Sequence, residues 1–353
     1  MLIFLIVIIS LSLLILSHEA GHFLVAKLFK LKINEFGFGF PPRIFAKRKH
    51  ETEYSLNWLP FGGFVKIAGE NEAMPFDESG EAAGRKEISK SEKKRLFSFQ
   101  PAWKRSLIIL AGVAVNFLIG WILISAVLMV GTPQTLVITG IQPNSPAATV
   151  GLMDGDIIHG FTKSSDFIRF VDAHRGGQIT VTIDRGGKEL TFTATPRVKM
   201  RAREGALGVF LAEGGAAKEG IIAALYNGLK ASLAISWAVL ATFYLLVKNL
   251  FIHGSLLAGV VGPVGIFSVA AEAGKIGFVY LVQLIGLISL NLAVINLIPF
   301  PALDGGRFLF ILIEKIKGSP IPRKAEAWLN GAGFAFLIFL IFLITVRDVR
   351  MWL

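Results

Sequence analysis

Long uncharged hydrophobic runs constrain this chain more than any other feature. Residues 1–17, MLIFLIVIISLSLLILS, carry no charged side chain, and similar runs lie at about 106–130, 276–300 and 331–346. A helix that crosses a bilayer needs about 20 mainly apolar residues. Only 17% of the 353 residues are charged and 53% are hydrophobic, whereas a soluble chain carries about 25% charged residues. The sequence predicts a polytopic α-helical membrane protein with about four spans.

A fifth apolar run, residues 231–247, lies between Lys230 and Lys248 and is short for a span. Residues 27–105 hold 16 Lys and Arg against 10 Asp and Glu, while residues 131–220 hold 10 against 9. The loop 314–324 is again positive. Because cytoplasmic loops carry the excess of basic residues, we expect 27–105 and 314–324 inside and 131–220 outside. That orientation needs no fifth span, so 219–252 is predicted to be an interfacial helix.

A short motif, His18-Glu19-Ala20-Gly21-His22, ends the first apolar run. On a helix, residues four apart share a face, so both imidazoles could bind one metal ion with Glu19 beside it as a general base. The alternative is a helix that happens to hold two histidines. Ionisable side chains at membrane depth are costly unless they are paired or bound to metal, and this favours the metal site.

An open catalytic zinc site needs a third protein ligand. The chain has no cysteine, which leaves histidine, aspartate or glutamate. Asp304 is the strongest choice, because it follows a span interrupted by Pro299 and Pro301 and precedes two glycines. Broken backbone at this depth is tolerated where it lines a cavity, and glycine permits close backbone approach. The alternative is an aspartate in an ordinary Asp-Gly turn.

Several segments together resemble the site-2 protease family of intramembrane metalloproteases, in its regulator-of-sigma-E-protease branch. They are HEAGH at 18–22, FGGFVK at 61–66, NSPAATVGLMDGDII at 144–158, GPVGI at 262–266 and NLIPFPALDGG at 296–306. The resemblance implies a zinc metalloprotease in which His18, His22 and Asp304 bind Zn²⁺ and Glu19 activates water. It also implies substrate-binding roles for Asn291 and Asn296, for which helix–helix hydrogen bonding is the alternative.

The resemblance further implies single-pass transmembrane proteins as substrates, in anti-sigma factor cleavage or removal of signal-peptide remnants. It places the chain in the cell (inner) membrane as a multi-pass protein, with the active site toward the cytoplasm. The strands expected in 37–69 resemble a membrane-associated β element that presents substrate by strand addition. One PDZ-like α+β domain is expected outside the cytoplasm. Because no carboxylate-binding loop is visible in it, a folded spacer is the alternative to a peptide binder.

These expectations divide the chain into eight parts: a first span with the motif (1–26), a cytoplasmic loop with membrane-associated strands (27–103), a second span (104–131), the PDZ-like domain (134–198), a linker and interfacial helix (199–252), a third span with a broken helix (253–311), a cytoplasmic loop (312–330), and a fourth span with the C-terminus (331–353).

Two other functions fit parts of the pattern. Ionisable residues within spans could mark the ion path of a transporter or channel. Four spans with a PDZ-like unit are, however, an unusual architecture for a transporter or channel. A pseudoprotease that binds membrane partners without cutting them is the other possibility, and the intact motif argues against it. The basic residues gather in loops beside spans, which favours contact with the lipid bilayer and excludes nucleic acid as a partner.

Overall fold

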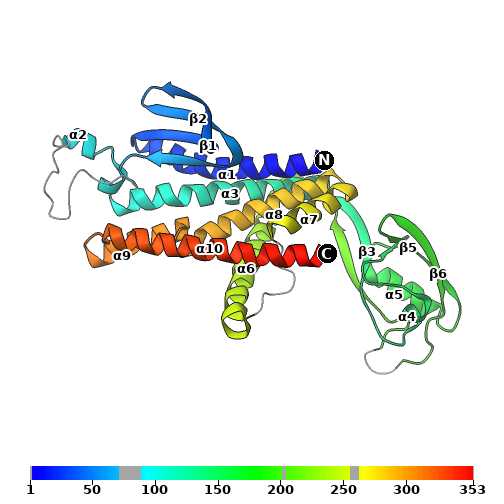
Figure 1. The fold of residues 1–353 in the computed structure, drawn as a ribbon. Helices are drawn as coiled ribbons and strands as arrows, with labels where there is room; N and C mark the ends of the chain where they lie inside the picture. The colour runs from blue at the N-terminus through cyan, green and yellow to red at the C-terminus, as the bar shows by residue number, and fades with distance from the viewer. Residues whose placement is uncertain (1, 71–88, 201–203, 255–261, 353) are drawn as a thin grey trace. The chain divides into compact units, whose positions relative to one another are not determined.

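The computed structural model describes residues 2–70, 89–200, 204–254 and 262–352. The chain divides into two compact units (Figure 1). The membrane unit comprises residues 1–126 and 225–353, and the small unit comprises residues 127–224.

Helices dominate the membrane unit, and one β-hairpin follows the first of them. Figure 1 draws α1, α3, α8 and α10 with their axes along one general direction and α6 across it. Two of its helices, α3 and α6, continue into the small unit. The elements are α1 (Leu2–Leu28), β1 (Ile33–Lys49), β2 (Thr52–Ile67), α2 (Lys90–Lys93), α3 (Ala102–Val130), α6 (Ile221–His253), α7 (Pro263–Ile276), α8 (Phe278–Leu297), α9 (Asp304–Lys317) and α10 (Arg323–Trp352).

Five of the described helices are long and apolar enough to cross a membrane: Ile3–Leu28, Ala102–Val130, Ile221–Leu250, Phe278–Leu297 and Lys324–Arg350. By length and composition the described helices thus give five candidate spans, where the sequence predicts about four crossings. The difference is α6. Its uncharged part has 17 residues, but the helix itself has 33, because Lys230 and Lys248 continue it. Long basic side chains near helix ends can reach the interface, so these lysines do not end the apolar helix.

The predicted strands of the first loop form an antiparallel hairpin in which Ile33 pairs with Ile67 and Lys49 with Thr52. The hairpin is irregular, with several register shifts. Phe23 of α1 lies against Phe36 of β1 with ring centroids 5.0 Å apart. At the other side of the hairpin, a Cβ built on Gly63 of β2 would lie 3.6 Å from Glu19 Cγ. The hairpin thus packs directly against the turn of α1 that carries the motif.

Two buried clusters hold α1 on either side of that turn. Near its C-terminal end, one cluster joins α1, the hairpin, α3 and α9; its members are Ala26, Leu31, Ile33, Ile67, Phe97, Ile108, Ile109 and Ile311. Near its N-terminal end, Val7 packs with Ala270 of α7 and Leu281 of α8. Burial of apolar side chains at both ends fixes the position of the motif between them.

The small unit has an α+β fold built on a five-stranded sheet in the order β6-β5-β4-β3-β7. Its elements are β3 (Thr132–Ile141), α4 (Pro146–Val150), β4 (Ile157–Ile158), α5 (Ser164–Ala173), β5 (Ile179–Arg185), β6 (Lys188–Ala194) and β7 (Val209–Ala216). Ser145 caps α4 by accepting a hydrogen bond from the Ala148 amide. A turn at Gly186 and Gly187 joins β5 to β6.

The compact unit is longer than the expected domain of residues 134–198. The edge strand β7 lies beyond residue 198 and pairs antiparallel with β3. A strand of this kind is hard to assign from sequence, because its pairing partner lies about 70 residues earlier in the chain and leaves no local signal.

Candidate metal centre

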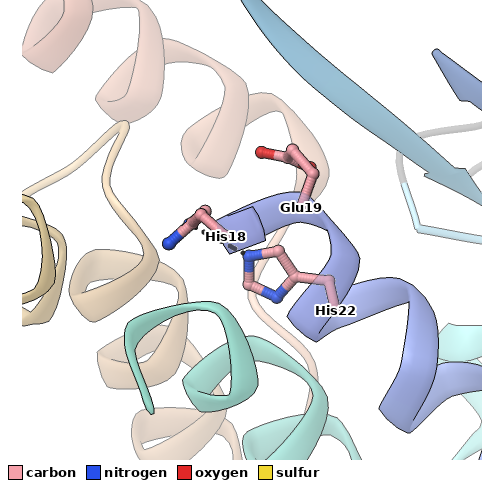
Figure 2. A group of neighbouring side chains, drawn as sticks. All are labelled: His18, Glu19 and His22. Carbon is pink, nitrogen blue, oxygen red and sulfur yellow. Dashed lines mark hydrogen bonds between the residues drawn. The ribbon is translucent and has the colours of Figure 1, made fainter. Parts of the chain in front are cut away.

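His18 and His22 lie one turn apart on α1 and face each other. Their Nε2 atoms are 3.1 Å apart, and the rings meet edge to face. Figure 2 shows the two imidazoles turned toward one another, while Glu19 leaves the helix in a different direction. One ligand atom from each of the three residues falls in a group no wider than 4.8 Å. The spacing of the motif alone produces this grouping, because residues i and i+4 share a helix face.

A carbonyl of α3 orients the ring of His22. Its Nδ1 lies 2.8 Å from the Ile108 carbonyl oxygen. Because a carbonyl only accepts hydrogen bonds, Nδ1 carries the proton and donates it. In the neutral ring Nε2 then has a free lone pair, directed at the space between the two histidines. Hydrogen bonds of this type fix the tautomer of histidines that ligate metals.

Asn116 of α3 contacts the ring of His18. It is 1% exposed, and its side-chain amide lies 3.5 Å from His18 Nδ1. Among the described residues no group donates to its Oδ1, which is buried. Amide oxygen and nitrogen are interchangeable in shape. With the amide turned over, Oδ1 would accept a hydrogen bond from Nδ1–H of His18, and Nε2 of His18 would also be free.

Glycines bring α1 and α3 close enough for these contacts. A Cβ at Gly112 would lie 2.5 Å from His22 Nε2 and 2.8 Å from His18 Cε1. A Cβ at Gly21 would lie 2.6 Å from the Ala111 carbonyl oxygen. Any side chain at either position would push the helices apart or fill the space in front of the imidazoles.

Asp304, the first residue of α9, reaches the histidines where the loop from α8 ends. Its Oδ2 lies 2.9 Å from His18 Nε2 and 3.3 Å from His22 Nε2. The loop doubles back tightly, so that a Cβ at Gly305 would be 2.2 Å from the Ile298 carbonyl oxygen. Ala302 has φ 74°, and its amide donates to Asn330 Oδ1 of α10 at 3.0 Å. The prolines and glycines seen in the sequence therefore build the turn that presents this carboxylate.

These three atoms fit a zinc ion. Zinc–ligand bonds of 2.0–2.1 Å in a tetrahedron place neighbouring ligand atoms about 3.3 Å apart. The observed separations are 3.1, 2.9 and 3.3 Å. In the described part of the chain Asp304 Oδ2 is buried without a partner in hydrogen-bonding geometry. A buried carboxylate oxygen without one is costly, and a cation between the three atoms removes the cost.

Two residues predicted to bind substrate take no part in the contacts that join this group. Asn291 and Asn296 lie on α8, both half-buried, and the hydrogen bonds and ion pairs described for the histidines and Asp304 do not involve them. The sequence analysis did not assign Asn116 a role. The available signal was an amide within an otherwise apolar span, which is costly unless it has a partner.

The residues around this centre also match a known family of proteins. Residues 6–340 match the family model described as Peptidase family M50. The chain belongs to this family. It is an intramembrane zinc metalloprotease of the M50 type, and its His18, Glu19 and His22 form a group that could hold a metal ion.

Curated relatives cover almost the whole chain. The regulator of sigma-W protease RasP of Bacillus subtilis is 29% identical, over 96% of this chain and 96% of its own. A putative zinc metalloprotease of Clostridium perfringens is 31% identical, over 96% of both chains. A putative zinc metalloprotease of Fusobacterium nucleatum is 32% identical, over 98% of both. The membrane-spanning protease predicted from the sequence is confirmed at the level of the family.

Proposed function

We propose that His18, His22 and Asp304 hold the zinc ion and that Glu19 is the general base in hydrolysis of peptide bonds of single-pass transmembrane proteins. One observation carries the assignment: Asp304, 282 residues beyond His22 in the chain, brings a buried oxygen within 2.9–3.3 Å of both imidazole Nε2 atoms. Three protein ligands leave the fourth position of a tetrahedral zinc site open for catalysis.

When bound, zinc supplies a Lewis acid that polarises the scissile carbonyl and makes water acidic at neutral pH. The protein supplies the rest. Glu19 takes a proton from the attacking water and gives it to the amine that leaves. Its carboxylate is not needed as a ligand, so it is free for proton transfer. The imidazoles are held by Ile108 and Asn116 with their Nε2 atoms aimed at one point.

The hairpin is the proposed platform for substrate. Gly63 of β2 lies against Glu19, so an extended peptide paired beside the hairpin would run close to the general base. Strand addition gives main-chain hydrogen bonds whatever the side chains are, and it opens a helical segment for hydrolysis. Large apolar side chains of the hairpin are exposed: Phe40, Ile44, Phe45 and Trp58. Their exposure supports contact with lipid. Asn291 and Asn296 are proposed to bind the substrate chain.

The regions expected in the cytoplasm lie together in the membrane unit. Arg105 pairs with Glu314 at 2.8 Å, which joins the first positive loop to the segment that precedes the second. The positive-inside rule then places both in the cytoplasm and the small unit outside, as a PDZ-like domain.

Contacts of α6 support a position along the membrane rather than across it. Near its start, the Leu225 carbonyl accepts from Trp121 Nε1 of α3; Trp121 is 13 residues beyond Ile108, about 20 Å along a helix. Near its end, Leu246 packs on Leu340 of α10, which is 10 residues beyond Asn330, about 15 Å. Ile108 and Asn330 both mark the level of the metal centre. Both parts of α6 therefore lie on one side of it, at similar depth.

Single cysteines test this orientation cleanly, because the chain has none of its own. In intact cells an impermeant thiol reagent should label Lys163→Cys, whereas Lys47→Cys and Lys317→Cys should react only after lysis. Labelling of Lys317→Cys in intact cells, on the same side of the membrane as Lys163→Cys, would contradict the four crossings.

Substrates are proposed to be anti-sigma factors or remnants of signal peptides. The Bacillus subtilis relative is named as a regulator of sigma-W, and both substrate classes are single transmembrane segments that must be cut at membrane depth. Comparing membrane fragments that accumulate in cells with Glu19→Gln and in cells with the native enzyme identifies which class is cut.

The direct test of the proposed function uses purified enzyme and a model transmembrane peptide. The native enzyme should bind one zinc and cleave the peptide. Glu19→Gln should keep that zinc and lose about 10²–10⁴-fold in rate, the usual contribution of a general base. Full cleavage by Glu19→Gln would contradict the role of Glu19, and loss of its zinc would make it a ligand instead.

A further inference from the structure

Two partly buried ion pairs fix α9, the helix that starts at Asp304. Arg307, in its first turn, pairs with Glu70 just after β2. Arg105 of α3 pairs with Glu314 near the other end. Both pairs line one cavity of about 460 Å³. The two pairs differ in their distance from the metal centre, because Glu314 is ten residues from Asp304, about 15 Å along the helix.

Arg307 has a second carboxylate within reach. Asp304 and Arg307 are three residues apart in the first turn of α9, a spacing that puts Cβ atoms about 5–6 Å apart and favours an Asp–Arg pair. Burial alone would lower the pKa of the Arg307 guanidinium, but the charges of Glu70 and Asp304 outweigh it and raise that pKa. Among the described residues Arg307 forms an ion pair with Glu70 alone, and Asp304 Oδ2 instead faces the histidines.

Glu70 occupies a rigid position. Its amide donates to the Ile67 carbonyl, the neighbouring Ala68 amide donates to the Lys32 carbonyl, and the Ala68 carbonyl accepts from the Phe97 amide. Ile67 and Phe97 belong to the buried cluster at the C-terminal end of α1. The Glu70 side chain is 9% exposed. The carboxylate is thus held by the same packing that holds α1 and α3 in place.

We propose that Glu70 is a positioning residue that holds the Arg307 guanidinium away from Asp304 and so keeps the Asp304 carboxylate available to zinc. The inference rests on the proposed role of Asp304 as a ligand. A guanidinium and a carboxylate form strong bidentate pairs. An Arg307–Asp304 pair would occupy the oxygens that zinc requires.

The proposal predicts opposite effects from the two halves of the ion pair. Without the Glu70 charge, Arg307 is a poorly solvated cation without its partner, and it is driven to the next strongest carboxylate, Asp304. Without Arg307, no competitor for Asp304 remains. A pair that only clamped the hairpin to α9 would behave differently, since removal of either partner would loosen α9 to a similar degree.

The test is zinc affinity, measured by competition with a chromophoric chelator on the full-length protein in detergent. Glu70→Gln should bind zinc about tenfold more weakly, as is typical when a group that orients ligands is lost. Arg307→Gln should bind zinc as the native protein does. The double variant should recover most of the affinity lost in Glu70→Gln, which also shows that Glu70→Gln is folded.

Glu314→Gln is the matched control, because it breaks the distant pair on the same helix and should leave zinc affinity unchanged. Equal losses in Glu70→Gln and Arg307→Gln without recovery in the double variant would overturn the proposal, as would native affinity in Glu70→Gln. Asp304→Asn belongs in the same series. Native zinc affinity there would refute the proposed ligand set itself, which separates the two failures.

Discussion

Two buried aspartates, one in each unit, are treated in opposite ways by the surrounding protein. Asp156 of the small unit is fully buried, and the chain satisfies both of its oxygens. Arg185 donates to each oxygen at 2.7 and 2.8 Å, and the Met153 amide donates to Oδ2 at 2.8 Å. Asp304 of the membrane unit presents Oδ2 to two imidazoles and, among the described residues, accepts no hydrogen bond there.

This difference distinguishes a buried carboxylate that stabilises the fold from one that is available to a ligand. A carboxylate that stabilises the fold accepts hydrogen bonds from protein donors at both oxygens. Its removal leaves a charged donor without a partner. A carboxylate that binds a metal ion keeps an oxygen to which no protein group donates a hydrogen bond. The nearby cation Arg307 is paired with a different carboxylate, that of Glu70. Substitution of each aspartate by asparagine should therefore affect different properties of the molecule.

The largest expected effect is that of Asp304→Asn on the metal. A neutral amide is a poor zinc ligand, and loss of a direct ligand should exceed the 10–100-fold that its orienting partners contribute. We expect zinc affinity to fall by more than about 100-fold and cleavage of a transmembrane peptide to stop. Zinc content after dialysis and cleavage by gel give both results. Unfolding of the small unit in Asp304→Asn would contradict the assignment of different roles to the two aspartates.

Asp156→Asn should instead destabilise the small unit. The guanidinium of Arg185 would lose its charged partner, and the fold would lose the charge-assisted hydrogen bonds of this pair. Amide hydrogen exchange should quicken in β4 and β5, while zinc content stays at the native level. A loss of zinc in Asp156→Asn would contradict the separation of the two roles.

The Asp156–Arg185 ion pair predicts how the free energy of unfolding of the small unit depends on pH. Burial alone would raise the pKa of Asp156, but the hydrogen bonds from Arg185 and the Met153 amide outweigh it and hold the pKa below its usual range. The folded state therefore binds the proton less tightly than the unfolded state. Its stabilisation is complete above the ordinary aspartate pKa and is lost as pH falls below that value. Protection factors of β5 amides should fall with acid in the native protein and change less in Asp156→Asn.

The smallest expected effect concerns Asn116, which orients His18 without touching the metal. Asn116→Ala should weaken zinc binding by about tenfold, in the range for residues that orient ligands. Ser125→Ala is the control, because Ser125 is equally buried on α3 but donates only to the Trp121 carbonyl. Equal zinc affinity in both variants would show that the amide of Asn116 has no orienting role.

Local patterns explain why much of the site could be predicted. Helical spacing alone puts His18 and His22 on one face, and the loop chemistry around Pro301 and Gly305 pointed to Asp304. The apolar runs gave the main helices for the same reason, since the bilayer sets their length.

The remainder depends on contacts between distant segments. Nothing local in the sequence indicates that Glu70 meets Arg307, 237 residues later, or that Ile108 offers its carbonyl to His22. The helix expected at 219–252 agrees with the bounds of α6, but its contacts with α3 and α10 leave no local signal in the sequence. The strand β7 was missed because its partner is remote.

X-ray absorption at the zinc edge tests the central claim most directly. Purified native enzyme loaded with one zinc should show two imidazoles and oxygen ligands in a four-coordinate shell. Asp304→Asn, loaded with stoichiometric zinc, should keep both imidazoles and change in the oxygen shell alone. A third imidazole in the native spectrum, or identical spectra for the two proteins, would contradict a site made by His18, His22 and Asp304.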